Sequence, residues 1–395
     1  MPLFLLWFYI DLSNIMYRYE DIRTLHIEMT ERCNASCPQC GRNINGGEQN
    51  QYIKNRELKL QDLQQFVPAE LCKQLTHIYI CGNYGDPIVA HDTLEVFRYF
   101  REQNKHLSLS MNTNGSARTI EWWQELAKIY DGKGYVIFSI DGLEDTNQIY
   151  RQNTSWSKII ENVRAFIDAG GRARWEYIVF AHNEHQVDEA KKLSEELGFE
   201  EFVTKKSARF MSLSGDIKEN TIVKDKKGNT ISIAPPKNAE YRNEGLKKIN
   251  TLNVQNISVT LPTTYSEISN KLNPEMFVQS DLQKIYDETT IDCKVKKDKS
   301  VYISAEGIVQ PCCWVASQMY PWYHSPRGSQ IWKLINKLGL DKINLHTHSL
   351  KDILNSGYFD LVVESWDKPS CREGKLAICS KVCGTNLETF SKQYS

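Results

Sequence analysis

Three cysteines near the N-terminus carry the clearest chemical signal in the chain. Cys33, Cys37 and Cys40 are spaced C-x3-C-x2-C and directly follow a short apolar run, residues 25–29. Thiolates in such a group select zinc or iron–sulfur clusters. A structural zinc site needs four protein ligands, and the nearest other Cys or His is His26, on the run before them. We therefore expect an iron–sulfur cluster in which one iron lacks a protein ligand and is open to chemistry.

The composition favours a metal-binding protein of a reducing compartment. The chain has 395 residues, enough for one barrel-sized domain and a smaller one. Its net charge of −1 argues against a nucleic-acid partner. Of the eleven cysteines, three lie near residue 36 and six lie between residues 293 and 383. Such clustering without a secretory signal favours metal ligation over disulfides, and we expect a cytoplasmic protein.

The first ten residues are apolar, but they do not meet the criteria for a membrane anchor. They are too few to span a bilayer, and they lack the positive segment and the cleavage site of a signal peptide. We expect no membrane span. Residues 1–20 are interpreted as an N-terminal segment that packs on the protein or contacts a second copy, or as residues that result from a start site assigned too far upstream.

Short β-rich runs alternate with longer amphipathic runs over the first half of the chain. The expected strands are residues 25–29, 77–81, 107–112, 135–140, 175–180 and 201–203. The expected helices are residues 60–74, 92–104, 118–130, 156–169 and 185–197. Six strands joined by five right-handed crossovers predict an α/β fold, a partial (β/α)6 TIM-like barrel over residues 21–209. Its functional site is expected at the carboxyl ends of the strands.

Within these strands one face is apolar and the other is polar. Because side chains alternate along a strand, the polar set is expected to point into the barrel; it comprises His26, Glu28, Tyr79, Cys81, Ser110, Asn112, Ser139 and Asp141. A barrel whose interior is only core is filled by Val, Ile and Leu. A polar interior therefore predicts a reaction chamber, although any one strand face could simply be solvated.

The cysteine spacing at the end of the first strand resembles that of the radical S-adenosylmethionine (radical SAM) enzymes. The resemblance implies that Cys33, Cys37 and Cys40 hold a [4Fe–4S] cluster whose open iron binds S-adenosylmethionine (SAM). A reductant such as flavodoxin or ferredoxin would then supply an electron, and cleavage of SAM would give a 5′-deoxyadenosyl radical that removes hydrogen from a substrate. Gln39 stands where this family usually has an aromatic residue.

Further motifs follow the later strands in the order of the same family. The turn after the second strand resembles Gly-Gly-Glu-Pro, the third strand ends in Thr-Asn-Gly, and the fourth ends in Ser-Ile-Asp-Gly with an arginine downstream. By this resemblance SAM would be bound by Gly85, Asp86, Pro87, Asn112, Asn114, Ser139, Arg151 and His182. Taken singly, each is also compatible with a tight turn, a surface ion pair or a loop histidine.

Residues 210–290 break the alternating pattern. Residues 221–233 predict a β-hairpin over an Asp-Lys-Lys-Gly turn. The segment is either a linker with an inserted hairpin or a lid over the mouth of the barrel.

A second group of cysteines defines the C-terminal part, residues 291–395. Cys293 and Cys312 flank a predicted hairpin that turns at Gly307. This spacing resembles the SPASM domain and its shorter twitch form, which add auxiliary clusters to radical SAM enzymes. The resemblance implies one auxiliary [4Fe–4S] cluster on Cys293, Cys312, Cys379 and Cys383, with Cys371 or the adjacent Cys313 as substitutes. Four cysteines also satisfy zinc.

The expected function is hydrogen abstraction followed by oxidation or rearrangement, with the auxiliary cluster transferring electrons. Asp141 and Glu176 are candidates for the base. The barrel is expected to begin near residue 25, which leaves no room for a leader-binding domain, so a small molecule or a carbohydrate is the expected substrate. The alternatives are a peptide- or protein-modifying enzyme and, more remotely, a non-enzymatic zinc or iron–sulfur protein such as an electron carrier.

Overall fold

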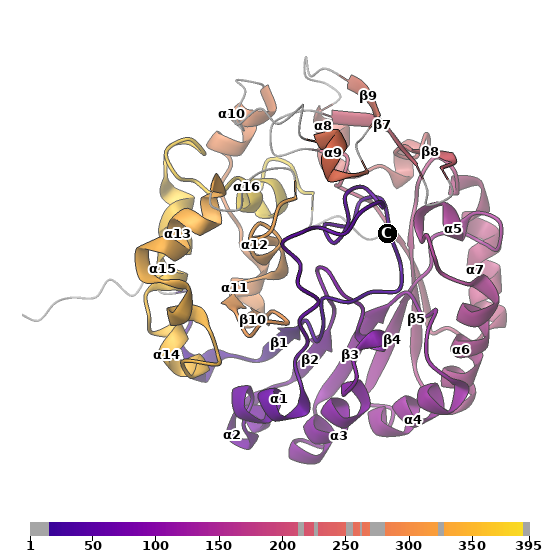
Figure 1. Ribbon diagram of the computed structural model, residues 1–395, viewed down its shortest axis with the longest axis horizontal. Coiled ribbons are helices and arrows are strands. Elements are labelled where there is room, and N and C mark those ends of the chain that lie inside the picture. The colour runs from indigo at the N-terminus through magenta and orange to yellow at the C-terminus, as the bar shows by residue number, and fades with distance from the viewer. Residues whose placement is uncertain are drawn as a thin grey trace, which may run out of the picture.

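An eight-stranded sheet organises the chain (Figure 1). The computed structural model describes residues 16–211, 217–224, 228–249, 256–260, 263–268, 281–322 and 328–389. The expectations for residues 1–10 lie outside the described residues. The first six strands are β1 (Thr24–Ile27), β2 (His77–Ile80), β3 (Ser108–Thr113), β4 (Gly134–Ser139), β5 (Ala173–Ile178) and β6 (Glu201–Lys205).

These six strands are parallel and lie side by side in sequence order, as predicted. The intervening helices are α1 (Leu60–Phe66), α2 (Ala69–Gln74), α3 (Thr93–Gln103), α4 (Ile120–Tyr130), α5 (Asn147–Tyr150), α6 (Trp156–Asp168) and α7 (Val187–Glu196). The expected helix at 60–74 is two helices, because Pro68 precedes α2 as its N-cap and cannot sit inside a helix. The α/β fold with a partial TIM-like barrel is therefore confirmed.

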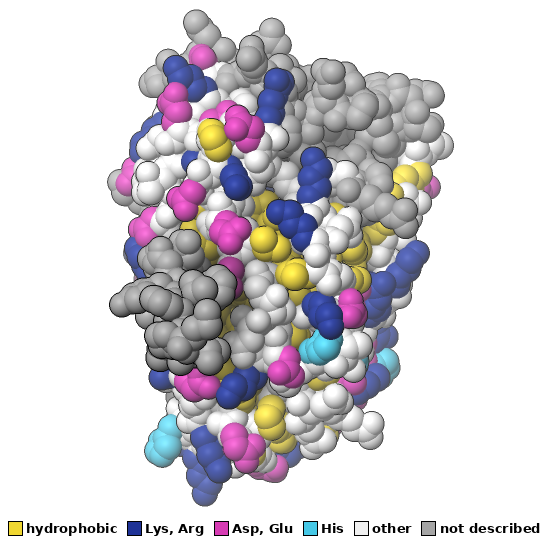
Figure 2. All heavy atoms as spheres, turned by 90° about the vertical axis from the view of Figure 1, so that its left-hand side faces the viewer, with side chains coloured by type: hydrophobic (Ala, Val, Ile, Leu, Met, Phe, Trp, Pro, Cys, Tyr) yellow, Lys and Arg dark blue, Asp and Glu magenta, His cyan; other side chains and the backbone are white. Residues whose placement is uncertain are grey.

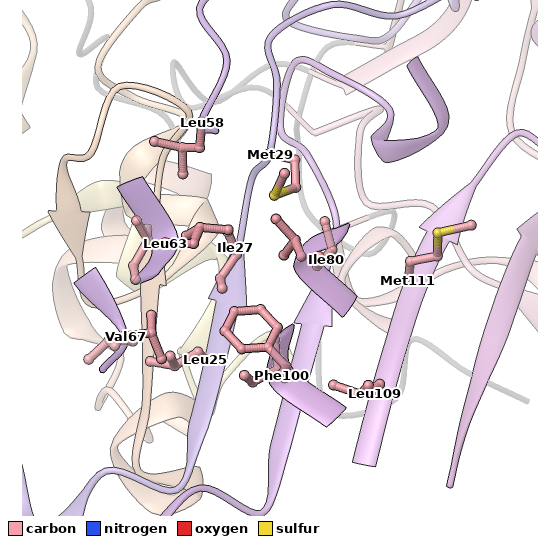
Figure 3. Close-up of a cluster of buried hydrophobic side chains, with 14 of the residues drawn as sticks. Leu25, Ile27, Met29, Leu58, Leu63, Val67, Ile80, Phe100, Leu109 and Met111 are labelled. Carbon is pink, nitrogen blue, oxygen red and sulfur yellow. The ribbon is translucent and has the colours of Figure 1, made fainter. Parts of the chain in front are cut away.

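The outer face of the sheet packs against the helices through the apolar half of each strand. Figure 3 shows part of this core, including Leu25, Ile27, Ile80, Leu109 and Met111 from the strands and Leu63, Val67 and Phe100 from the region of α1 and α3. All of these side chains are fully buried. Burying an aliphatic or aromatic side chain contributes about 1.5–3 kcal/mol, so this face fixes which residues of each strand point inward.

Two C-terminal strands extend the sheet beyond the six that were expected. β10 (Ser300–Ile303) pairs in parallel with β1, in the register Thr24↔Ser300, and β11 (Val309–Gln310) pairs antiparallel with β10. The predicted hairpin is present, with Gly307 in the left-handed region (φ +79°). It continues the barrel sheet rather than forming a separate one.

The remaining elements lie beside and above this sheet (Figure 1). The helices on the β10 side are α10 (Asp281–Glu288), α11 (Lys294–Asp298), α12 (Cys313–Ala316), α13 (Gln330–Leu338), α14 (Leu350–Leu354), α15 (Tyr358–Glu364) and α16 (Ala377–Cys383). On the molecular face shown in Figure 2, basic and acidic side chains are interspersed. No helix in the described ranges is long and apolar enough to cross a membrane.

Between residues 217 and 268 the chain forms a small second sheet, β7 (Ile217–Lys224), β8 (Thr230–Ile233) and β9 (Asn256–Thr260), in the order β8-β7-β9. The β7–β8 hairpin matches the predicted one. α8 (Glu244–Ile249) and α9 (Tyr265–Ile268) accompany it. The division of the chain at residues 20, 209 and 290 stays a prediction.

Candidate active site

A cavity of about 820 Å³ lies along the inner face of the sheet. Both groups of cysteines border it, namely Cys33, Cys37 and Cys40 from the loop after β1, and Cys293, Cys312, Cys379 and Cys383 from the C-terminal part. Of the other predicted site residues, those that line the cavity are Gly85, Asp86, Asn112, Asn114, Ser139, Arg151 and Glu176. Pro87, Asp141 and His182 are not among its lining residues.

The thiols of Cys33 and Cys37 are contacted by the backbone of their own loop and by Arg151, which follows α5. The Ala35 N–H donates to Cys33 Sγ at 3.3 Å. Arg151 Nη1 lies 4.0 Å from Cys37 Sγ. Burial raises the pKa of the Cys37 thiol to about 11. The thiol is therefore protonated in the metal-free protein, and metal binding must release its proton.

The turn after β2, residues 82–86, packs directly on the cysteine loop. A Cβ on Gly85 would lie 1.7 Å from the Thr30 carbonyl oxygen, so the glycine is needed for this approach. The Asp86 N–H donates to the Arg32 carbonyl at 2.9 Å. The Asp86 carboxylate accepts from Asn114 N and Nδ2 at 2.8 and 2.7 Å. In this geometry Asp86 ties the two strand ends together.

The polar faces of β3 and β4 point into the cavity, as the alternation predicted. Asn112 and Ser139 both line it, and neither side chain makes a hydrogen bond with the residues that the structure describes. Their donors and acceptors are therefore available to a bound molecule.

Asp141 and Arg151 form an ion pair beside the first cysteine group. Arg151 Nε donates to Asp141 Oδ2 at 2.6 Å, and the Ile178 N–H donates to Oδ1 at 2.6 Å. The Asp141 side chain has no exposed surface. Burial raises its pKa, against the opposing effect of Arg151. The role of Asp141 as a base stays a prediction, but these contacts favour a role in orienting Arg151.

Glu176 differs from Asp141 because it faces the cavity. Its Oε2 lies 3.1 Å from Lys205 Nζ of β6. Lys205 was not predicted as a site residue. The signal that could have found it is its position at the end of the last expected strand, where parallel strands place functional groups.

His182 lies after β5, against the ring of Phe180. The two rings are nearly parallel, with centroids 5.3 Å apart. Both ring nitrogens are buried and have no hydrogen-bond partner within the described ranges. Burial lowers the pKa of His182 to about 4, so the ring is neutral near pH 7. Pro87 is likewise buried, at the start of a short 3-10 helix, η3 (Pro87–Val89).

Gln39 is contacted by an arginine that the sequence analysis did not single out. Arg209 Nη1 donates to the Gln39 carbonyl at 3.2 Å and to the Tyr150 hydroxyl at 2.9 Å. Arg209 lines the cavity. It therefore places a second cation near Cys37 and Cys40, beside Arg151.

Comparison with known proteins indicates which kind of domain carries this first group of cysteines. The family model described as the Radical SAM superfamily matches residues 27–196, which include the last residue of β1, strands β2 to β5 and the first three cysteines. The chain carries a radical SAM domain. Domains of this superfamily use a [4Fe–4S] cluster and SAM. The thiols of Cys33, Cys37 and Cys40 fit such a cluster, and Asn112 and Ser139, which line the same cavity and make no side-chain hydrogen bond to a described residue, are available to SAM.

One curated relative of the radical SAM domain matches only in part. It is the tungsten-containing aldehyde ferredoxin oxidoreductase cofactor-modifying protein of Pyrococcus furiosus, 29% identical over 128 residues. The match covers 32% of this chain and 33% of the relative.

Several solved structures are similar at low identity. SuiB of Streptococcus suis bound to its precursor peptide SuiA is 17% identical, with a TM-score of 0.45 over 74% of this chain and 59% of SuiB. The structure anSMEcpe with bound AdoMet is 16% identical, with a TM-score of 0.49 over 91% and 88% of the two chains. BtrN in complex with AdoMet and 2-DOIA is 13% identical, with a TM-score of 0.39 over 94% and 97%. With TM-scores below 0.5, these similarities carry no argument about the substrate.

The second group of cysteines lies at the starts of α11 and α12 and along α16. Cys293 precedes α11, Cys312 precedes α12, and Cys379 and Cys383 are one turn apart on α16. A hydrogen bond shared with Cys383 lowers the pKa of Cys293 to about 7 and raises that of Cys383. All four border the cavity.

The two substitute cysteines lie in different surroundings from these four. The Cys371 N–H donates to Asp287 Oδ1 at 2.7 Å, and its thiol is not among the groups that line the cavity. Cys313 also lines the cavity, and burial and the nearby Cys81 thiol raise its pKa to about 12.

Within the described ranges, no three Cys, His, Asp or Glu side chains converge as ligands of a single metal ion do. Cysteines that share an iron–sulfur cluster bind different iron atoms.

Proposed function

We propose that this protein is a radical SAM oxidoreductase or rearrangement enzyme that acts on a small molecule or a carbohydrate in a reducing compartment, the cytoplasm. The observation that carries the proposal is that one cavity of about 820 Å³ is bordered by both groups of cysteines and also lined by polar side chains of the strands. All eleven cysteines are free thiols, which is consistent with a reducing compartment.

The first site is assigned to the cluster and SAM. Cys33, Cys37 and Cys40 would hold a [4Fe–4S] cluster, which with SAM supplies a 5′-deoxyadenosyl radical when a flavodoxin or ferredoxin provides an electron. Arg151 is assigned to the SAM carboxylate, because guanidinium groups pair well with carboxylates. Asn112, Ser139 and the turn at residues 82–86 would bind the other polar groups.

The walls between the two cysteine groups would receive the substrate. The acidic and basic side chains there, Glu176 and Lys205, form an ion pair. A balanced pair suits a neutral, hydrogen-bonding substrate, and Glu176 is the carboxylate placed to accept a proton. An auxiliary [4Fe–4S] cluster on Cys293, Cys312, Cys379 and Cys383 would give this chamber a one-electron acceptor, as net oxidation requires.

The test is the metal content of anaerobically reconstituted protein beside the Cys33/Cys37/Cys40→Ala variant. We expect about eight irons per chain in the parent and about four in the variant, by cluster stoichiometry. Adding dithionite and SAM should give 5′-deoxyadenosine in the parent alone. Zinc at both sites, with no 5′-deoxyadenosine formed, would contradict the proposal that this protein is a radical SAM enzyme. If a deuterated peptide transferred deuterium to 5′-deoxyadenosine and deuterated sugars and alcohols did not, the substrate would be a peptide and not a small molecule or a carbohydrate.

A further inference from the structure

The turn at residues 82–86 is held by the C-terminal part of the chain as well as by the barrel. It packs on the loop of Cys33, Cys37 and Cys40 and borders the shared cavity. Its other contacts come from β1, β10 and the start of α12. The position of the turn therefore depends on residues far apart in the sequence.

Glu28 supports the backbone of this turn. It lies at the end of β1 and is 1% exposed. Its Oε1 accepts the N–H groups of Tyr84 and Gly85 at 2.7 and 3.2 Å. Its Oε2 accepts the hydroxyl of Tyr302, from β10. A single buried carboxylate thus joins a C-terminal strand to two backbone amides of the turn.

Asn83 makes a second connection. Its Nδ2 donates to the Cys313 carbonyl at 2.8 Å and to the Tyr302 hydroxyl at 3.3 Å. Its own carbonyl lies 3.9 Å from Cys40 Sγ. Because Cys313 directly follows Cys312, Asn83 lies between a thiol of the first group and the backbone that carries a thiol of the second.

The turn also packs tightly against the cysteine loop, so a displacement of the turn must displace the loop as well. The Thr30 carbonyl would be 1.7 Å from a Cβ on Gly85, which leaves no free space between the two segments. Closely packed interiors transmit such displacements.

We propose that Glu28 and Asn83 are positioning residues through which the C-terminal cysteine site sets the geometry of the SAM-binding turn. The proposal rests on the proposed function, which assigns SAM to residues 82–86. Because coupling between two binding sites is reciprocal, SAM should in turn affect metal binding at Cys293, Cys312, Cys379 and Cys383.

The first test uses the full-length, metal-free protein and needs no activity. Hydrogen–deuterium exchange is measured at the Tyr84 and Gly85 amides in Tyr302→Phe and Asn83→Ala. We expect exchange at these two amides to be at least threefold faster in both variants. Tyr99→Phe is the matched control, because Tyr99 on α3 donates its hydroxyl to the Val67 carbonyl at 2.8 Å and makes no contact with the turn among the described residues. Unchanged exchange in both test variants would overturn the proposal.

The second test measures SAM affinity by equilibrium dialysis on reconstituted protein with equal iron content. We expect Tyr302→Phe and Asn83→Ala to bind SAM about threefold to tenfold more weakly than Tyr99→Phe, the range for one lost hydrogen bond. Faster exchange with unchanged affinity would show that the turn is held but not coupled, and would overturn the proposal. If the parent binds no iron, the proposed function fails, whereas the exchange result still decides whether Tyr302 and Asn83 hold the turn.

Discussion

Arg151 and Asp141 form an ion pair with an Nε–Oδ2 distance of 2.6 Å, and the carboxylate is fully buried while the guanidinium side chain is 17% exposed. The exposed part of the guanidinium faces the cavity, where Nη1 lies 4.0 Å from Cys37 Sγ. The pair thus holds a cation beside the predicted cluster ligands, with its counter-ion behind it.

Removing the carboxylate should destabilise the fold. We expect Asp141→Ala to lower the free energy of unfolding by roughly 3 kcal/mol, because it leaves a largely buried cation unpaired. Urea denaturation of the metal-free protein measures this. The Asp141→Ala/Arg151→Gln double variant should be less destabilised than the sum of the single variants; strict additivity would show that the two residues do not act as a pair.

The auxiliary site can be separated from its nearest substitute. We expect Cys379→Ser to reduce the reconstituted protein from about eight to about four irons, since one of the four proposed ligands is lost. Cys371→Ser should keep about eight, because its thiol does not line the cavity. Iron analysis distinguishes the two variants. A loss of iron in Cys371→Ser alone would show that Cys371, and not Cys379, is the cluster ligand.

The adjacent residues Cys312 and Cys313 likewise allow a proposed auxiliary ligand to be compared with a substitute cysteine. Cys312→Ser should lose the auxiliary iron, whereas Cys313→Ser should retain it, because Cys313 lies toward Cys81 and Glu28. Electron paramagnetic resonance of the dithionite-reduced variants is the readout. Equal loss in both variants would mean that the fold around α12, rather than a thiolate, is required.

Replacing Gly85 should damage the first site without touching a thiol. A Cβ there would overlap the Thr30 carbonyl oxygen at 1.7 Å and approach the Arg32 carbonyl oxygen at 2.8 Å, and backbone atoms cannot rotate away. We expect Gly85→Ala to cost roughly 1–3 kcal/mol of stability and to lower the iron content. Gly328→Ala is the control, since no atom of the described residues lies within 4 Å of its added Cβ. Matching melting curves for the two variants would contradict this prediction.

Glu28 should make stability depend on pH. Burial raises its pKa from 4.5 to about 7, against the opposing effect of its hydrogen bonds. The folded state therefore favours the protonated acid, and this stabilisation is present below pH 4.5 and is lost as the pH rises through about 7. The shift corresponds to about 3 kcal/mol. Glu28→Gln should remove this pH dependence from the free energy of unfolding measured with urea. Parallel plots of unfolding free energy against pH for the parent and the variant would contradict the role of Glu28.

The sequence was sufficient to predict the first six strands, because the alternation of residues such as Leu25 and His26 directly encodes which side of the sheet is buried. The addition of β10 to the edge of β1 was missed. Strand pairing over such a separation leaves no local pattern, and Val301 and Ile303 read equally well as a separate hairpin.

At the site, residue types were predicted better than contacts. The seven cysteines of the two predicted groups border one cavity, and their role as cluster ligands stays a prediction. The sequence could not show that Asp86 Oδ2 accepts from Asn114 while its Oδ1 caps η3 by accepting from the Ile88 N–H, or that His182 stacks on Phe180 away from the cavity. Glu28 carried a usable signal, since a carboxylate within an apolar strand needs a partner, but that partner, Tyr302, comes from the other end of the chain.

The pairing of β10 with β1 also bears on how the protein is made. Until residues 300–303 have left the ribosome, β1 has one unpaired edge, and its backbone groups can pair with another chain. The nascent barrel is thus exposed to aggregation through most of its synthesis. A chain shortened to residue 209 would keep this open edge permanently, so the barrel should not be expressible in soluble form without its C-terminal strands.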